Sequence, residues 1–318
     1  MEARLNLRTP PPVPISALSA GAPRGHPERL RIARAMQAAL AAAGDFESHQ
    51  PLLLAPPPAA TPERLLELLQ QAAIEASQAC GFSSEWYRSH DLAWWIRRTA
   101  LHCFAPPHST AKQARARIRT VCRTRGPARS EREYRILLSP GEQLLASART
   151  EWILVDRASG RPLRGSGDQP GSAAAATVDA AAPRSNHPPR LGVAPALPTT
   201  PPTRVGTRRI VARDLDSLGH VNNTRYAAFA MAAVHSAWPD APPPPALRVL
   251  SLDLTYLRPT YLGDQLDLLT WLAPALPTAL PGGGQTRSAE ILLTRGPQPV
   301  ARILGVWSAP PPSAGGAS

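Results

Sequence analysis

The chain has 318 residues, of which 43% are hydrophobic and 18% are charged, and its formal net charge is +12. This length allows two domains of ordinary size, and the composition supports a packed core, which excludes a disordered polymer held open by charge. The sequence holds no run of about 18 apolar residues that could span a membrane, and it shows no secretory signal pattern. We therefore expect a cytoplasmic protein without a membrane span.

The charge bears on which partners the protein could bind, and the cysteines bear on disulfides and metal sites. Lys112 is the only lysine, so nearly all of the positive charge is arginine. This bias is typical of a GC-rich genome, and the alternative interpretation is an acidic partner. The sequence has no clustered basic run of the kind that indicates nucleic-acid binding. Cys80, Cys103 and Cys122 lack the spacing of a disulfide framework or a zinc site. Since phosphate-binding glycine motifs and a serine-nucleophile elbow are also absent from the sequence, we expect no cofactor and no metal.

In chain order the sequence divides into five segments. The first, 1–61, is a Pro/Ala-rich leader with one helix, predicted over 27–44 between Pro27 and Gly44. The others are a structured block over 62–164, a disordered Gly/Pro/Ala/Ser-rich linker over 165–204, a second structured block over 205–308, and a disordered tail over 309–318.

Both structured blocks repeat one order, a long helix followed by four strands. The first block has a helix predicted over 63–79 and strands over 92–104, 114–121, 131–138 and 143–155. The second has a strand over 208–213, a helix over 223–238, and strands near 247–257, 264–272, 287–295 and 299–308. A curved antiparallel sheet can wrap around each helix, and the two sheets can pair edge to edge, which covers their exposed edges. The predicted fold class is α+β, a double hotdog with two long central helices.

Residues 213–226 read Arg-Asp-Leu-Asp-Ser-Leu-Gly-His-Val-Asn-Asn-Thr-Arg-Tyr. This string resembles the entrance to the central helix in hotdog thioesterases, and 255–271 (TYLRPTYLGDQLDLLTW) looks like the strand, turn and strand that follow there. In the first block, 68–81, 91–98 and 144–162 resemble the N-terminal hotdog of the acyl-acyl-carrier-protein (acyl-ACP) thioesterases. The resemblance implies a catalytic C-terminal hotdog, a non-catalytic N-terminal hotdog that shapes an acyl pocket, and a role in fatty acid biosynthesis.

The chemistry of the 213–226 string also follows from its residue types. Asn222 or Asn223 is a good N-cap, so the positive end of the following helix faces the turn and can stabilise an oxyanion. Asp216 can act as base or nucleophile, while His220 positions water or the substrate carbonyl. Gly219 permits a backbone conformation that other residues avoid. Each residue alone is an ordinary turn or capping residue, but the joint spacing favours catalysis.

The sequence departs from the family pattern at three places. Leu218 stands where the acyl-ACP thioesterases have Asn, Pro259 falls where they carry a carboxylate, and 230–232 (Ala-Met-Ala) lacks the helix acid of many other hotdog thioesterases. Three alternatives follow: Asp216 carries the base role alone, Asp264 contributes, or activity is reduced or absent. For Asp264, which follows a glycine, a turn residue is the simpler interpretation.

Substrate-binding residues are expected on both blocks. Gly219 and Tyr226 lie in the turn and at the start of the helix that follows it. Trp94 and Trp95 are candidates for the wall of the acyl pocket, although a cluster of tryptophan and aliphatic residues is first of all a core.

Three arginines alternate along the predicted strand 114–121: Arg115, Arg117 and Arg119. Alternation places them on one face, where they could dock an acidic carrier protein and speed the encounter with it. The structural alternative is a cross-strand charge ladder with Glu131 and Glu133 on the neighbouring strand.

Taken together, these patterns predict an enzyme that hydrolyses fatty acyl-ACP thioesters to free fatty acid, with acyl carrier protein or acyl-CoA as its partner and no nucleic acid. One alternative is a hotdog thioesterase that acts on acyl-CoA or aryl-CoA. The other is an acyl-binding scaffold that has lost catalysis. The oligomeric state is open, and a homodimer is one option.

Overall fold

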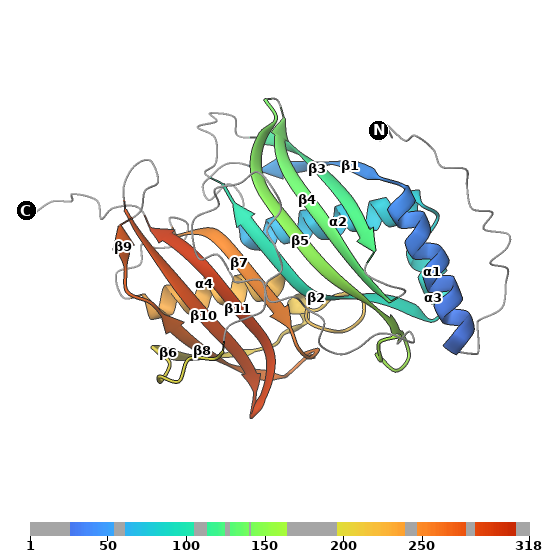
Figure 1. The fold of residues 1–318 in the computed structure, drawn as a ribbon. Helices are drawn as coiled ribbons and strands as arrows, with labels where there is room; N and C mark the ends of the chain where they lie inside the picture. The colour runs from blue at the N-terminus through green and yellow to red at the C-terminus, as the bar shows by residue number, and fades with distance from the viewer. Residues whose placement is uncertain are drawn as a thin grey trace, which may run out of the picture.

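The computed structural model describes residues 26–53, 61–104, 113–124, 128–139, 141–163, 196–238, 247–277 and 284–309. The start of the predicted leader, most of the predicted linker and the tail after residue 309 lie outside these ranges. Within them, two hotdog units follow each other along the chain, so the predicted double hotdog is confirmed (Figure 1).

The N-terminal hotdog is built on helix α2 (Pro62–Ala79). Thr61 caps this helix by accepting a hydrogen bond from the N–H of Arg64, and its Leu and Ala residues form the buried face. The short helix α3 (Ser84–Ser89) follows. Four strands then wrap α2, close to their predicted positions: β2 (Leu92–Cys103), β3 (Gln113–Thr124), β4 (Arg129–Ser139) and β5 (Gln143–Asp156).

The predicted leader contributes more than one helix. Helix α1 (His26–Ala42) matches the predicted helix, but it is followed by strand β1 (Asp45–Leu53), which pairs with β3. The prediction missed β1 because its sequence contains Pro51, which is tolerated at a sheet edge and argues against a central strand. α1 packs on the same hotdog through Ile32, Met36 and Leu40. Residues 26–53 therefore belong to the N-terminal hotdog and not to a separate leader.

The C-terminal hotdog opens with β6 (Arg204–Arg209), a short 3-10 helix (Ala212–Asp214) and helix α4 (Arg225–Ala237). The strands that wrap α4 are β7 (Arg248–Tyr256), β8 (Gln265–Leu272), β9 (Leu276–Pro277), β10 (Gln285–Arg295) and β11 (Gln298–Ala309). The end of the predicted linker is ordered in the structure, because the carbonyl of Thr200 accepts a hydrogen bond from the indole of Trp271 at 2.7 Å.

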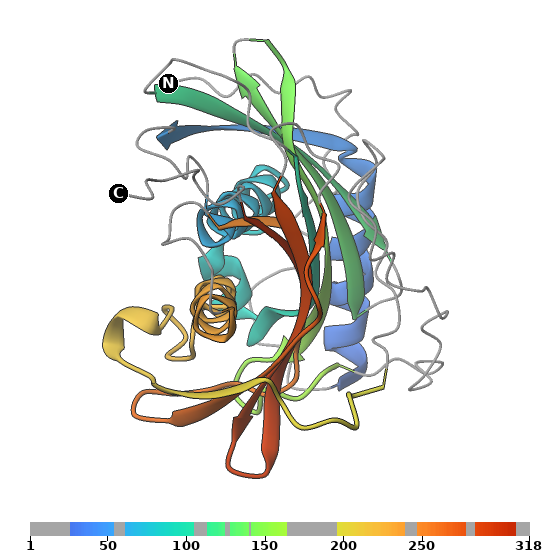
Figure 2. The ribbon, with the colours of Figure 1, turned by 90° about the vertical axis from the view of Figure 1, so that its left-hand side faces the viewer.

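All strands join one antiparallel sheet in the order β1-β3-β4-β5-β2-β7-β11-β10-β8-β6, with β9 paired to β10. Both hotdogs thus use the same spatial order, and they meet where β2 pairs with β7. Arg98 of β2 and Asp253 of β7 form a bidentate ion pair at this junction, with 2.6 Å between Nε and Oδ1. Figure 2 shows the sheet curving around both central helices, as the edge-to-edge pairing predicted.

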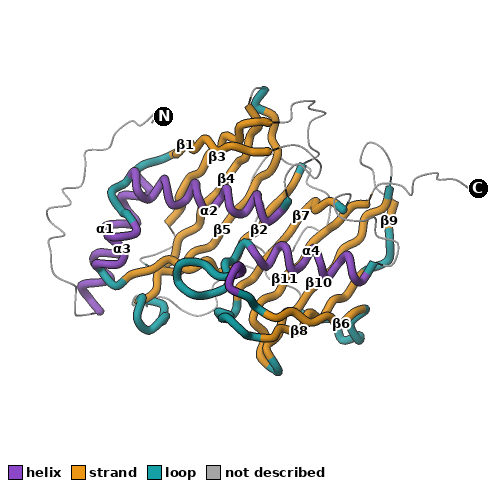
Figure 3. The backbone as a smooth tube through the Cα atoms, turned by 180° about the vertical axis from the view of Figure 1, so that it is seen from behind, coloured by secondary structure: helices purple, strands orange, loops and turns teal. Residues whose placement is uncertain are grey.

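The two central helices lie on the concave face of the sheet and share one hydrophobic core (Figure 3). Their N-terminal ends meet near the middle of the sheet, where Arg225 of α4 forms an ion pair with Glu63 of α2. Because α4 begins at this meeting point, the loop that precedes it lies against the N-terminal hotdog.

Candidate active site

The predicted catalytic turn lies between the 3-10 helix and α4. The N–H of Asp216 donates to the carbonyl of His220 at 2.8 Å, and the N–H of Gly219 donates to the carbonyl of Asp216 at 3.1 Å. Gly219 has a φ of +79°, which confirms that this position favours glycine. The partly exposed carboxylate of Asp216 accepts a hydrogen bond from the N–H of Leu218 at 2.8 Å. The backbone of the turn therefore orients the carboxylate that the sequence identified.

The imidazole of His220 lies between aromatic rings from both hotdogs. Its centroid is 5.5 Å from that of Trp95 on β2 and 5.3 Å from that of Tyr261, with interplanar angles of 83° and 72°. Both contacts are edge-to-face arrangements, which aromatic rings favour. Among the described residues, no hydrogen bond joins the side chains of His220 and Asp216. Packing against these two rings therefore sets the position of the imidazole, and Trp95 is in direct contact with a residue of the turn.

The start of α4 differs from the prediction. The helix begins at Arg225, and the N-cap is Thr224, whose side chain makes no capping hydrogen bond. Asn222 acts just outside the helix, because its Oδ1 accepts from the N–H of Thr224 at 3.1 Å and its carbonyl accepts from the N–H of Arg225 at 2.9 Å. The carbonyl of Asn223 accepts from the hydroxyl of Tyr256 at 3.1 Å. Both asparagines therefore fix the entrance to the helix, but neither is its N-cap.

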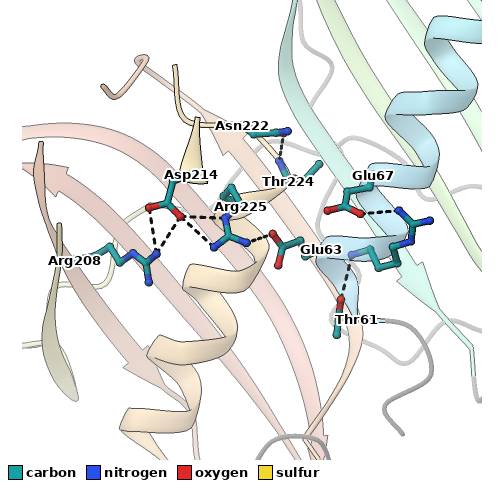
Figure 4. A network of polar contacts seen from close by, with 9 residues as sticks. Thr61, Glu63, Glu67, Arg208, Asp214, Asn222, Thr224 and Arg225 are labelled. Atoms are coloured by element: carbon teal, nitrogen blue, oxygen red, sulfur yellow. Dashed lines mark hydrogen bonds and ion pairs between the residues drawn. The ribbon is translucent and has the colours of Figure 1, made fainter. Parts of the chain in front are cut away.

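A buried carboxylate that the sequence analysis did not single out supports this entrance. Asp214 is fully buried and accepts hydrogen bonds at 3.1 Å from Arg208, from Arg225 and from the N–H of Val211. Burial opposes the ionisation of Asp214, but these hydrogen bonds and the two guanidinium charges outweigh it and lower the pKa of the carboxyl group. Figure 4 shows Arg225 bridging Asp214 and Glu63. The available sequence signal was the position of Asp214 two residues before Asp216.

A cavity of about 320 Å³ lies in the N-terminal hotdog and reaches the turn. Its apolar walls include Phe82, Leu92 and Trp94, and the turn residues Ser217 and Leu218 complete the lining. A concave, mostly apolar site with a few polar groups is typical of a small-molecule site. Because Ser217 directly follows Asp216 in the chain, the cavity ends next to the turn that contains Asp216 and His220.

The predicted substrate-binding residues have different positions. Trp94 lines the cavity, whereas Gly219 and Trp95 are not among the lining residues. Gly219 follows the lining residue Leu218 in the chain, and Trp95 contacts His220. Tyr226 is only 3% exposed, and its hydroxyl forms a 2.8 Å hydrogen bond with the hydroxyl of Thr260. Burial raises the pKa of Tyr226 to about 12. The side chain of Tyr226 therefore serves the core of the C-terminal hotdog and is not part of the cavity lining.

The three arginines considered for carrier docking lie along β3 at Arg115, Arg117 and Arg119. Arg117 and Arg119 bind Glu47 of the edge strand β1, at 3.3 and 3.1 Å. The expected partners, Glu131 and Glu133, bind Arg149 of β5, and Glu133 also pairs with Arg123 of β3 at 3.7 Å. A charge ladder is therefore present, but the acid that Arg117 and Arg119 share, Glu47, comes from the strand that the prediction missed. Arg117 also pairs with Glu142.

Asp264 was the alternative catalytic acid. Its carboxylate accepts a hydrogen bond from the N–H of Tyr261 at 3.0 Å and pairs with Arg295 at 2.7 Å, so it is a turn residue with an ion partner. In the part of the chain that the structure describes, no three His, Cys, Asp or Glu side chains converge to form a metal site. None of the helices described is long and apolar enough to span a bilayer.

Residues 59–167 match the family model of the acyl-ACP thioesterase N-terminal domain. Among solved structures, a candidate oleoyl thioesterase from Lactobacillus plantarum aligns with a TM-score of 0.62 at 16% identity, covering 86% of this chain and 98% of that one. The 12:0-ACP thioesterase from Umbellularia californica aligns with a TM-score of 0.60 at 16% identity, covering 83% and 93%. An acyl-ACP thioesterase from Bacteroides thetaiotaomicron aligns with a TM-score of 0.53 at 15% identity, covering 82% and 97%. No curated protein matches this sequence.

The fold and the family match together define the class of the protein, which is a hotdog-fold thioester hydrolase. The predicted resemblance to the acyl-ACP thioesterase family is confirmed over residues 59–167.

Proposed function

We propose that the protein hydrolyses fatty acyl thioesters carried by acyl carrier protein, with its chemistry on the turn from Asp216 to His220. One observation carries this proposal: the lining of the cavity includes Ser217 and Leu218 of that same turn. An acyl chain that enters the N-terminal hotdog therefore leaves its thioester group at the turn of the C-terminal hotdog.

In the proposed reaction Asp216 is the general base. It removes a proton from water, the water oxygen attacks the thioester carbonyl carbon, and the C–S bond breaks. The thiol sulfur leaves with the bonding electrons and takes up a proton. The oxyanion faces the first turn of α4 near Asn222 and Asn223, where the positive end of the helix stabilises it. His220 holds the carbonyl in place, supported by the rings around it.

Charge supports an acidic carrier protein as the substrate's carrier. The net charge of the chain is +12, and Arg115 on β3 is exposed next to the ladder formed with Glu47. Exposed complementary charge mainly raises the rate of encounter, and salt screens this effect.

The test offers the purified full chain one acyl group on acyl carrier protein and the same group on CoA, and follows the release of free thiol. We expect kcat/KM to be higher on the carrier protein and to fall as salt is added. Preference for CoA assigns the alternative thioesterase function, and thiol release from neither substrate assigns the non-catalytic acyl-binding function. Both results would overturn the proposal.

A further inference from the structure

We propose that the cavity accepts acyl chains with a carboxylate at the end far from the thioester, and that Arg132 binds this carboxylate. The inference deepens the proposed function, on which it rests for the placement of the thioester end. It concerns the opposite end of the same cavity.

Arg132 is a buried cation on the wall of the cavity. It lies on the inward face of β4, in the same row as the buried residues Ser130 and Tyr134, and is only 7% exposed. Both Arg132 and Ser130 line the cavity. Arg132 makes no ion pair or hydrogen bond with any residue that the structure describes. A guanidinium group is always charged, and a buried charge normally has a partner.

The neighbouring acids cannot supply that partner. Glu131 and Glu133 flank Arg132 in the sequence, but alternation along the strand turns them to the other face of the sheet. There they bind Arg149 of β5, at 3.7 and 2.6 Å. Among the described residues, the cavity lining includes three arginines and no Asp or Glu. Burial raises the pKa of Tyr87, another lining residue, so its phenol is neutral at neutral pH and offers no counter-charge.

The order of the strands places Arg132 away from the turn. The cavity is lined by Trp94 on β2, Trp152 on β5, Arg132 on β4 and Cys122 on β3, which are consecutive strands of the sheet. The catalytic turn lies at the β2 end, where His220 contacts the same strand. Neighbouring strands are about 4.8 Å apart, so β4 lies roughly 10 Å from β2. An acyl chain that starts at the turn can pass Trp94 and Trp152 and bring its far end to Arg132.

A carboxylate at that end fits this site better than a methyl group. A plain alkyl chain would displace the water around the guanidinium group and leave the charge without a partner. A carboxylate can form two parallel charge-assisted hydrogen bonds with it. The cavity should therefore discriminate between chains by the chemistry of their far end.

The test measures the binding of two matched probes by calorimetry: the monomethyl ester and the dimethyl ester of one long-chain dicarboxylic acid. The ester group stands in for the thioester, so the probes differ only in the free carboxylate. We expect the monomethyl ester to bind about tenfold more tightly or better to the wild-type chain. This ratio should fall to about one in Arg132→Met and should partly persist in Arg132→Lys, which keeps the charge.

Arg157→Met is the matched control, because Arg157 also lines the cavity but is exposed. The preference should survive this change. Equal affinities in the wild type would overturn the inference, and so would loss of the preference in Arg157→Met with retention in Arg132→Met. Thermal unfolding establishes that each variant is folded. If Arg132→Met does not fold, the comparison is made with Arg132→Lys.

The binding test is independent of turnover, which separates the two proposals. Asp216→Asn should show the same carboxylate preference as the wild type. If no thiol is released but the preference is present, the proposed function fails and this inference stands. If thiol is released but the two probes bind equally, only this inference fails.

Discussion

Trp95 of the N-terminal hotdog stands edge-on to His220 of the C-terminal hotdog, with 5.5 Å between the ring centroids. The ring of Trp95 also packs closely against Gly160. A Cβ atom at Gly160 would lie only 2.7 Å from Cη2 of the tryptophan ring. The N-terminal hotdog therefore contacts the histidine of the turn in the C-terminal hotdog. The pairing of β2 with β7 joins the two units that this contact connects.

Substitution of Gly160 tests this arrangement. Gly160→Ala adds a methyl group that must displace the ring of Trp95, and it also strains a residue whose φ is +66°. We expect a loss of about 1 kcal/mol or more in the free energy of unfolding from the backbone strain, and a larger fall in kcat as His220 loses its support.

Gly44→Ala is the control for that strain, because Gly44 has a φ of +67° and no atom within 4 Å of an added Cβ. It should lower stability by a similar amount and leave kcat unchanged. Equal effects of both substitutions on kcat would show that Trp95 does not position His220.

Asp216→Asn removes the proposed base while it keeps the size of the side chain. We expect kcat for thioester hydrolysis to fall at least about 100-fold, because general base catalysis commonly contributes that much. Stability should change little, since this carboxylate is partly exposed. Asp45→Asn, at an exposed position on the edge strand β1, is the control and should be as active as the wild type. An undiminished rate in Asp216→Asn would exclude this residue as the base.

Asp214→Asn should lower stability more than it lowers affinity for acyl chains. The change removes the buried anion that Arg208 and Arg225 share, and breaking a buried ion pair costs about 3–5 kcal/mol. Chemical denaturation of both proteins at neutral pH measures this difference. A change below about 1 kcal/mol would contradict the role of Asp214 as the structural anchor of the α4 entrance.

The same pair of proteins gives a pH prediction. The pKa of Asp214 is lower in the folded state than its ordinary value, so the folded state favours the ionised form. Its contribution to stability is complete above the unfolded-state pKa of about 3.9 and is lost as the pH falls through the folded-state pKa. The stability difference between wild type and Asp214→Asn should therefore be constant at neutral pH and shrink in acid. A constant difference down to strongly acid pH would contradict this assignment.

Arg115→Glu tests carrier docking without breaking the ladder, because Arg117 and Arg119 are the residues that bind Glu47. We expect kcat/KM on acyl carrier protein to fall several-fold at low salt and its salt dependence to weaken, while hydrolysis of acyl-CoA stays unchanged. Arg248→Glu, an exposed arginine on β7, changes the net charge equally and is the control. If both variants slow the reaction alike, overall charge and not the β3 face governs the encounter.

Local patterns were sufficient to predict most elements of the fold. The helical spacing of apolar residues in α2 and the alternation along β5 depend on which side chains are buried, and burial repeats with the period of each element. Strand β1 escaped prediction because an edge strand needs only one neighbour and can include Pro51. The turn around Gly219 was predictable because its φ of +79° requires a particular residue type at a particular spacing.

The sequence by itself determined the two repeated units, the turn with Asp216 and His220, and the thioesterase class, because each is encoded in residues that lie near one another along the chain. The tertiary structure alone decided that Trp95 contacts His220 and that Asp214 pairs with two arginines. It also decided that Arg132 has no ion-pair or hydrogen-bond partner among the described residues. These relationships depend on which faces of distant strands and helices meet, and the order of strands in the sheet sets that meeting. Glu131 and Glu133 illustrate the reason: they are the nearest acids to Arg132 in the chain, and the pleat of the strand turns both away from it.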